Sequence, residues 1–293
     1  MEIDGVMLND LVTEYTFDTT GVHTVKYELY DETKLGNQAP VFHNSNLVEC
    51  VIPNSVNTIG TNVFMNCNSI TSIDIPNSVI SIGNNAFGMC SGLTSVVIPN
   101  TVTSIGSNAF SSTNALKVLN YNAKCELSSS FGGNWTNLET VIIGDSTSSI
   151  SSGVFNGYTG LTSINVNSGN TTYDSRNNCN AIIETSTNTL IQGCKTTIIP
   201  DSVTNIGNKA FYDCKSLTSI VIPNNVTSIE DDAFNGCVGL TNVTVNTTTP
   251  PTLGSRAFNN TNDCLIYVPS ASVETYKAAT NWSNYANRIQ AIP

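Results

Sequence analysis

The residues of this chain that could do chemistry are nine cysteines, two histidines and a small set of carboxylates. An odd number of cysteines cannot all pair within one chain, so their spacing is more informative than their count. Four of them, Cys67, Cys90, Cys214 and Cys237, stand three residues after a phenylalanine. Such a regular spacing is typical of a buried structural position. We therefore expect a ladder of small, buried and poorly reactive thiols at these positions.

No metal site or catalytic site is indicated by the sequence. There is no Cys-x-x-Cys pair, and His23 and His43 both lie near the N-terminus. The G-x-S-x-G, H-E-x-x-H, P-loop and G-x-G-x-x-G signatures are absent. The acidic run 230–232 lacks the alternating oxygen ligands of a calcium loop, so we expect a solvated turn there. The sequence predicts a protein that is not an enzyme and that holds no metal or cofactor.

Composition restricts the class of partner. Apolar residues make up 40% of the 293 residues, which is enough for a substantial core, whereas charged residues make up only 11%. The net charge of −11 argues against nucleic acid or an anionic lipid surface as a partner, because both require a cationic face. No apolar run is long enough to span a membrane, and Met1 opens a polar stretch that does not resemble a signal peptide. We expect a monomer that reaches a membrane only through segments outside this sequence.

A repeat of 23 residues organises most of the chain. The units that begin at Ile70 and Leu93 are 23 residues apart, and Leu217 opens another unit of the same pattern. About nine such units, some of them degraded, run from Leu47 to just before Leu265. A single unit cannot bury its few apolar side chains, so the units must stack on one another.

The sequence pattern within each unit predicts three short segments of structure: a strand, a turn and a helical turn. The pattern L-x-x-I-x-I-P has the alternation of a strand, and its proline ends the ladder because it cannot donate a hydrogen bond. The pattern V-x-x-I-G is then expected to turn back, with a glycine available for a positive φ. The pattern A-F-x-x-C is expected to form one helical or 3₁₀ turn that directs the phenylalanine and the cysteine inward. The predicted fold class is an α/β, β-rich solenoid.

These units resemble the leucine-rich repeats of the BspA-like surface protein family. The family pattern L-x-x-I-x-I-P-x-x-V-x-x-I-G-x-x-A-F-x-x-C is matched from about Leu47 to Phe258, and the tail from Ile266 to Trp282 resembles the end of such proteins from gut bacteria. The resemblance implies a right-handed leucine-rich repeat superhelix. It also implies a cell-surface or secreted protein that adheres to host proteins, including those of the extracellular matrix, or to other cells.

The two ends of the chain are expected to cap the stack. Residues 1–46 are predicted to form an N-terminal hairpin cap, with strands over 12–17 and 22–29, followed by an eroded repeat that includes Leu35 and Phe42. Residues 265–293 are predicted to form a last strand and a C-terminal cap with a helix over 270–279.

The solenoid itself is predicted to cover residues 47–264, with a hairpin inserted at about 167–196. Its strands, 179–184 and 189–194, would flank a turn at 185–188 and place Cys179 opposite Cys194. The two sulfur atoms would be close enough for a disulfide at a non-hydrogen-bonded pair. Two reduced thiols at the base of the hairpin are the alternative, and we favour it.

The residues predicted to bind a ligand lie on the strand face. Because side chains alternate along a strand, the second, third and fifth residues of each unit should face solvent. Several fifth-position residues are apolar, and an exposed apolar column is a candidate binding patch. The alternative is that β-branched residues are present there for strand propensity. The predicted ligand-binding residues are Val51, Asp74, Val97, Asn120, Ile142, Asn165, Ile198, Val221 and Tyr267, with Thr244 in the same column.

Three functions remain open from the sequence. The first is a non-enzymatic binding protein that presents its strand face for adhesion. The second is a structural spacer or self-assembling surface component that uses the apolar column as its self-contact. The third is a glycan-recognition module, which would require a cluster of exposed aromatic residues, and the candidates are Tyr121, Trp135 and Tyr158.

Overall fold

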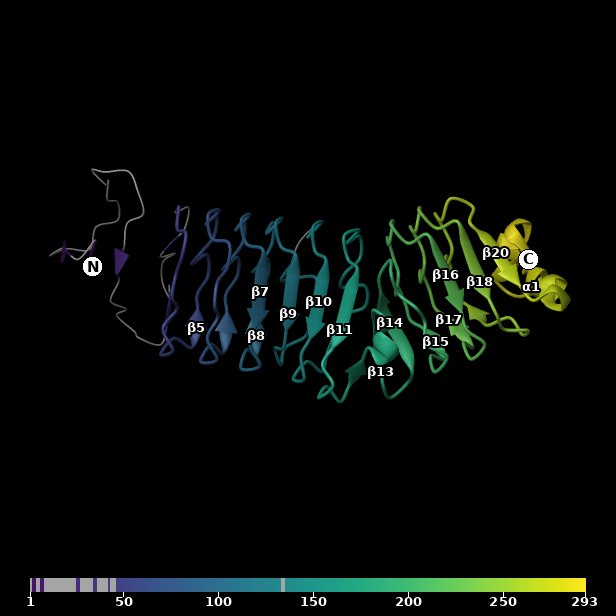
Figure 1. Ribbon diagram of the computed structural model, residues 1–293, viewed down its shortest axis with the longest axis horizontal. Helices are drawn as coiled ribbons and strands as arrows, with labels where there is room; N and C mark the ends of the chain where they lie inside the picture. The colour runs from purple at the N-terminus through teal and green to yellow at the C-terminus, as the bar shows by residue number, and fades with distance from the viewer. Residues whose placement is uncertain are drawn as a thin grey trace.

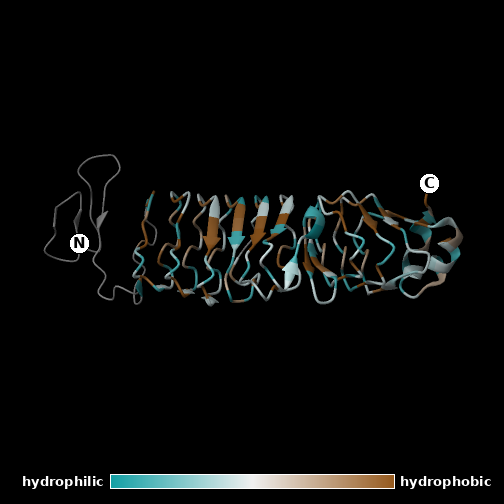
Figure 2. Ribbon diagram, turned by 60° about the horizontal axis from the view of Figure 1, so that its bottom comes forward, coloured by the Kyte–Doolittle hydropathy of each residue, from teal (hydrophilic) through white to brown (hydrophobic). Residues whose placement is uncertain are grey.

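The computed structural model describes residues 2–3, 6–7, 25–26, 34–35, 42, 46–132 and 135–293. The repeats form an elongated β-solenoid, in which successive coils stack side by side from β5 (Thr58–Ile59) to the helix α1 (Val273–Ala278) near the C-terminus (Figure 1). Hydrophobic residues are distributed along the whole length of the stack (Figure 2). The fold class predicted from the repeat is therefore confirmed as a leucine-rich repeat solenoid with little helix.

The first strand of each coil forms a parallel sheet along one side of the stack. In the N-terminal half this sheet contains β7 (Ser95–Ile98), β9 (Val118–Tyr121), β10 (Thr140–Ile143) and β11 (Ser163–Val166), in the order β11-β10-β9-β7. Equivalent residues of the repeat are paired in register, so that Val96, Leu119, Val141 and Ile164 lie in one row. All four are buried, as the alternation of the strand predicts.

A second parallel sheet forms where the sequence predicted only a turn. The residues around the Ile-Gly pair form β4 (Lys34–Leu35), β5, β6 (Ser81–Ile82) and β8 (Ser104–Ile105), in the order β4-β5-β6-β8. The prediction was wrong here because it considered one coil alone. Stacking places the same two residues of neighbouring coils side by side, and their backbone groups then complete a short ladder.

The Ala-Phe-x-x-Cys side of the coil also differs from the predicted helical turn. It is a series of hydrogen-bonded turns in which Asn62, Asn85 and Asn108 have φ values of 60°, 50° and 58°. Asparagine tolerates this left-handed region better than most residues. The backbone N–H groups donate to the next coil, as in the 2.8 Å bond from Phe64 to the carbonyl of Ala86. Bonds between coils therefore alternate with local bonds between residues three apart, such as the 3.1 Å bond from Cys67 to the carbonyl of Phe64.

The repeat phenylalanines form two ladders through the core, as predicted. Phe42, Phe64, Phe87 and Phe110 stack with centroid distances of 5.3, 5.1 and 5.0 Å. A second ladder of Phe211, Phe234 and Phe258 has distances of 4.9 and 5.2 Å. Near-parallel rings at these distances are a favourable arrangement of aromatic pairs.

All nine cysteines lie in the described part of the chain and are free thiols. Cys67, Cys90 and Cys237 are fully buried, whereas Cys214 is half-buried. Burial raises the pKa of the Cys90 thiol to about 12. The ladder of reduced thiols is thus confirmed.

The hairpin in the middle of the chain is part of the stack and does not project from it. Its strands β13 (Ala181–Glu184) and β14 (Thr189–Gly193) join β12 (Tyr173–Asp174), β15 (Asn205–Ile206), β17 (Ser228–Ile229) and β19 (Thr252–Leu253) in one sheet. A short 3₁₀ helix, η1 (Arg176–Asn178), precedes the hairpin. Ile182 packs in the N-terminal core and Ile183 in the C-terminal core, so the hairpin separates two hydrophobic clusters.

A β-bulge explains why Cys179 does not face Cys194. The register of the hairpin shifts between Ile182 and Ile183, so that Ala181 pairs with Gly193. Extending that register pairs Cys194 with residue 180, and the Cys194 thiol donates to the carbonyl of Asn180 at 3.4 Å. A slip of one residue moves side chains to the opposite face, and the two thiols indeed pack in different cores. The prediction that Cys179 lies opposite Cys194 was wrong because it did not include the bulge. The favoured alternative, in which both cysteines are reduced thiols, is confirmed.

The C-terminal half repeats the architecture and ends in a cap. Its main sheet contains β16 (Ser219–Ile222), β18 (Asn242–Val245), β20 (Leu265–Val268) and β21 (Ile289–Ala291). The predicted helix is present as η2 (Ser270–Ser272) and α1, followed by η3 (Trp282–Arg288). Tyr276 of α1 and Trp282 of η3 are fully buried and pack in the C-terminal core. The added strand β21 was not predicted.

At the N-terminus, β1 (Glu2–Ile3) pairs antiparallel with both β2 (Val6–Met7) and β3 (Val25–Lys26). The predicted strand over 12–17 lies outside the described residues, and so does the turn that follows it. Leu35 in β4 is buried and pairs with Ile59, and Phe42 heads the aromatic ladder. The segment before residue 47 thus contributes side chains at two positions of the repeat.

Candidate ligand-binding face

The predicted fifth-position column lies outside the core along the whole stack. None of its residues is buried, and the most exposed are Val51 at 82% and Ile198 at 75%. Backbone pairing places its members side by side, as in the row Val97, Asn120 and Ile142. Whether these residues bind a ligand remains a prediction.

The column is not a continuous apolar patch in its N-terminal half. Val51 is bridged to Asp74, and Asn120 stands between Val97 and Ile142 in the register of the sheet. Each apolar side chain therefore has a polar neighbour on the next coil. Surface hydrophobic residues that are separated in this way need no partner to cover them. The expectation of one apolar patch along the column was wrong for this half.

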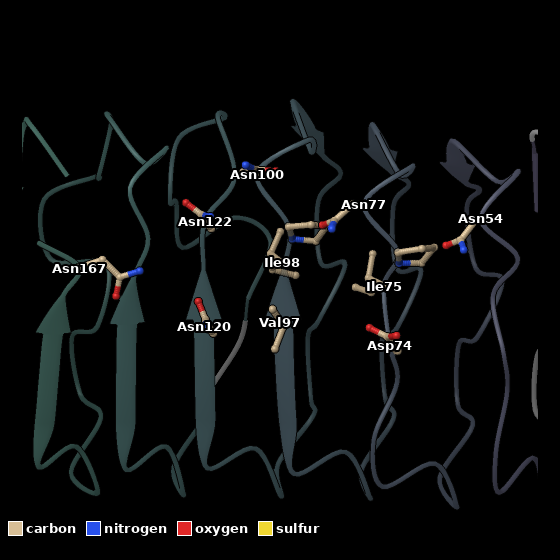
Figure 3. Close-up of a pocket in the computed structure, with 12 residues that line it drawn as sticks. Asn54, Asp74, Ile75, Asn77, Val97, Ile98, Asn100, Asn120, Asn122 and Asn167 are labelled. Atoms are coloured by element: carbon tan, nitrogen blue, oxygen red, sulfur yellow. The ribbon is translucent and has the colours of Figure 1, made fainter. Parts of the chain in front are cut away.

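A groove lies on this face at the ends of the strands, over the coils from β5 to β11. It has a volume of about 450 Å³ and is lined mainly by asparagine (Figure 3). The buried residues Ile75, Pro76, Ile98 and Pro99 also line it. The polar lining residues are Asn54, Asp74, Asn77, Asn100, Asn120, Asn122 and Asn167.

Two rows of side chains line this groove. Asn54, Asn77 and Asn100 each follow the Ile-Pro pair that ends a strand, on three successive coils (Figure 3). Asp74 precedes such a pair by one residue, and Val97 and Asn120 occupy the same outward position on the next two coils. Neighbouring strands are about 4.7–4.9 Å apart, so each row presents one side chain per coil at that spacing.

The groove contains three of the residues predicted from the sequence, Asp74, Val97 and Asn120. The others in the predicted column lie outside its lining. Sequence reasoning missed the asparagines that follow Ile-Pro, because the column was defined from strand alternation and stopped at the proline. Their recurrence in the pattern Ile-Pro-Asn, at positions 54, 77, 100 and 224, was the available signal.

The aromatic residues proposed for glycan recognition are not available. Tyr121 is fully buried and Trp135 is 2% exposed, while Tyr158 is half-buried. Burial raises the pKa of the Tyr158 phenol to about 12. The degraded middle units retain their core through these rings, so the candidates do not form the exposed cluster that glycan recognition would require.

The acidic run 230–232 has a structural role. Glu230 accepts a hydrogen bond from the backbone N–H of Asn208, Asp231 accepts one from Ser255, and Asp232 pairs with Arg256 at 2.7 Å. The run lies in a turn with Glu230 and Asp231 exposed, as expected, whereas Asp232 is buried, and all three carboxylates connect neighbouring coils. Within the described residues, no group of three His, Cys, Asp or Glu side chains is arranged to hold a metal ion.

The stack and its strand face define a leucine-rich repeat protein. The model of the BspA-type leucine-rich repeat region matches residues 12–131, 127–192 and 189–280, with six copies of the repeat region. The chain therefore belongs to the BspA-type leucine-rich repeat family.

Two solved structures align with most of this chain. A leucine-rich cell surface protein of Faecalibacterium prausnitzii A2-165 is 22% identical, with a TM-score of 0.49 over 89% of this chain and 82% of that protein. The pneumococcal vaccine antigen PcpA is 16% identical, with a TM-score of 0.47 over 89% of this chain and 85% of that protein. No curated protein is similar enough in sequence to count as a relative. In the part of the chain that the structure describes, no helix is long and apolar enough to cross a membrane.

Proposed function

We propose that this protein is a non-enzymatic binding protein that presents the strand face of its solenoid to a protein or another cell-surface macromolecule. The leading role is adhesion at a bacterial surface or after secretion. Membership of the BspA-type family supports this proposal, and repeat solenoids generally use such extended faces for binding.

The observation that carries the proposal is the uniform chemistry of this face. From Ser95 to Tyr267, the third and fifth positions of the units hold only Ser, Thr, Asn, Val, Ile, Leu and Tyr, although the chain has a net charge of −11. These side chains project from rigid parallel ladders, so little conformational entropy is lost when a partner orders them. These two columns are long, rigid and uncharged, which favours a macromolecular ligand over a small charged metabolite.

The test is a binding screen of the purified chain against immobilised extracellular-matrix proteins and whole cells. The double variant Val97→Asp with Ile142→Asp should abolish binding to any partner found, because it removes two apolar contacts and adds two carboxylates that a partner would have to desolvate. Neither residue belongs to the buried core. We therefore expect the melting temperature to change little.

The matched control is Met89→Asp with Val238→Asp. These residues are 47% and 50% exposed on the turn side of the coils, away from the strand face. The control should bind like the parent. Loss of binding in the control, or binding by a folded Val97→Asp and Ile142→Asp variant, would place the interface elsewhere. Concentration-dependent polymers in light scattering, without capture of any partner, would favour the structural spacer.

A further inference from the structure

Five of the six asparagines that line the groove have side-chain hydrogen-bonding groups that are not used within the described part of the protein. The sixth, Asn122, accepts a 2.8 Å bond from the backbone of the following coil, as Asn84 does outside the groove, and Asn137 donates a 2.7 Å bond to the carbonyl of Asn114. Side chains of this kind connect coils. In the described structure, by contrast, five groove asparagines make no side-chain hydrogen bond within the protein: Asn54, Asn77, Asn100, Asn120 and Asn167.

The prolines beside the first row remove one backbone hydrogen-bond donor from each coil. Pro53, Pro76 and Pro99 precede Asn54, Asn77 and Asn100, and a proline has no N–H group. The side-chain amides therefore add donors on each coil, beside the backbone N–H of the asparagine itself. Each amide offers two N–H donors and a carbonyl acceptor.

A ligand that matches this groove must offer donors and acceptors along its length without a strong net charge. The main chain of an extended polypeptide does so at every residue. A glycan also carries such groups, but the described lining contains no aromatic ring on which a sugar could stack. The buried aliphatic and proline side chains in the lining suit the side chains and Cα groups of a peptide.

Asp74 adds a preference for a basic residue in the ligand. Asp74 is the charged member of the described lining, it is exposed, and it makes no ion pair or hydrogen bond within the protein. A lysine or arginine of the ligand could pair with it, in keeping with the net charge of −11. An exposed pair of this kind contributes modestly to affinity and more to selection among partners.

We propose that the groove binds an extended segment of a partner protein, with its main chain hydrogen-bonded to the asparagine amides and a lysine or arginine opposite Asp74. This inference rests on the proposed function, since it names the chemistry of the partner on the same face.

The test uses pools of blocked octapeptides that are degenerate except for one central residue, fixed as Lys, Arg, Gln or Glu. Binding is measured by fluorescence anisotropy, and the side-chain NH₂ signals of asparagine are followed by NMR. The Lys and Arg pools should bind about two to five times more tightly than the Gln pool, as expected for an exposed ion pair, and the Glu pool most weakly. The advantage of the Lys and Arg pools should decrease with added salt.

Two variants separate the two parts of the proposal. Asp74→Asn should remove the preference for Lys and Arg and leave the affinity for the Gln pool unchanged. The double variant Asn77→Ala with Asn100→Ala should weaken all pools about tenfold. Asp201→Asn and Asn224→Ala, which also follow Ile-Pro but lie outside the groove, are the controls and should bind like the parent.

Equal binding of the Lys and Glu pools, or equal losses in the control variants, would overturn the proposal. Maltoheptaose and xylohexaose are titrated in parallel, and asparagine-dependent binding of a sugar without peptide binding would also overturn it. If the peptides fail while Val97→Asp with Ile142→Asp still removes capture of a folded protein, this inference fails and the proposed function stands.

Discussion

The indole Nε1 of Trp135 donates a 3.0 Å hydrogen bond to the backbone carbonyl of Phe110 on the preceding coil. Regular coils make the equivalent bond with a cysteine. The thiol of Cys90 lies 3.0 Å from the carbonyl of Phe64, and Cys237 makes the same contact with Phe211. The cysteine position of the repeat is therefore a position for a buried donor, which a degraded coil fills with tryptophan.

The change Trp135→Phe should test this relationship, because it keeps most of the ring and removes the donor. The Phe110 carbonyl would retain its 2.9 Å bond from the Thr113 hydroxyl. We expect a loss of about 1 kcal/mol in the free energy of unfolding, at the low end for removal of a buried hydrogen bond. Urea unfolding monitored by circular dichroism measures it. An unchanged midpoint would mean that the bond contributes nothing to stability.

Because the phenylalanines of the ladders are buried and stacked, we expect their replacement by alanine to reduce the free energy of unfolding strongly. Phe87→Ala and Phe234→Ala should each cost about 3–5 kcal/mol, because both rings are buried between two neighbours. Hydrogen exchange should increase in the adjacent coils more than in distant ones, since each coil contacts only its neighbours. If either variant melts within a degree or two of the parent, the inward position of that ring is wrong.

Because the thiols are buried, we expect the free energy of unfolding to decrease at alkaline pH. Burial raises the pKa of both Cys90 and Cys214 to about 12, against about 8.5 in an unfolded chain. Between these values the unfolded state releases protons and the folded state does not. The stabilisation is therefore complete below about pH 8.5 and decreases as the pH rises toward 12.

Thermal unfolding from pH 8 to pH 11 measures this slope. The triple variant Cys90→Ser, Cys214→Ser and Cys237→Ser is the control, and it should show a shallower decrease with pH. Cys90 and Cys237 of the folded parent should resist an aromatic disulfide reagent at pH 8, because the thiol is protonated and covered. A slope that is equal in parent and variant would exclude the thiols as its source.

The sequence predicted the features that depend on one coil and missed those that depend on neighbours. The inward positions of Ile73 and Phe87 follow from alternation and spacing within a unit, and both are buried. The second sheet and the bulge in the hairpin arise from contacts between coils, and no local pattern encodes them. In the groove, Asp74 and Asn120 could be placed by alternation, whereas Asn77 and Asn100 lie beyond the proline that ends the strand and were indicated only by the recurring Ile-Pro-Asn pattern.

Gly193 marks the boundary between the two halves of the core, and its substitution tests how tightly they are joined. It ends β14, pairs with Ala181, and donates a 2.8 Å hydrogen bond from its N–H to the carbonyl of Ala210. A Cβ at this position would lie 2.2 Å from a ring carbon of Phe211. That ring is fully buried and stacked on Phe234, so it has little freedom to move.

Gly193→Ala should therefore cost about 1–3 kcal/mol in unfolding free energy, as is typical when a packed core is overfilled. Hydrogen exchange should increase in β13, β14 and β15 and stay unchanged in β7 and β9, which are several coils away. Gly88→Ala is the control, because its Cβ would meet no atom closer than 3.3 Å and should have little effect. Equal stability of the two variants would show that the junction between the halves relaxes freely, and the hairpin would then be a flexible joint and not a rigid part of the stack.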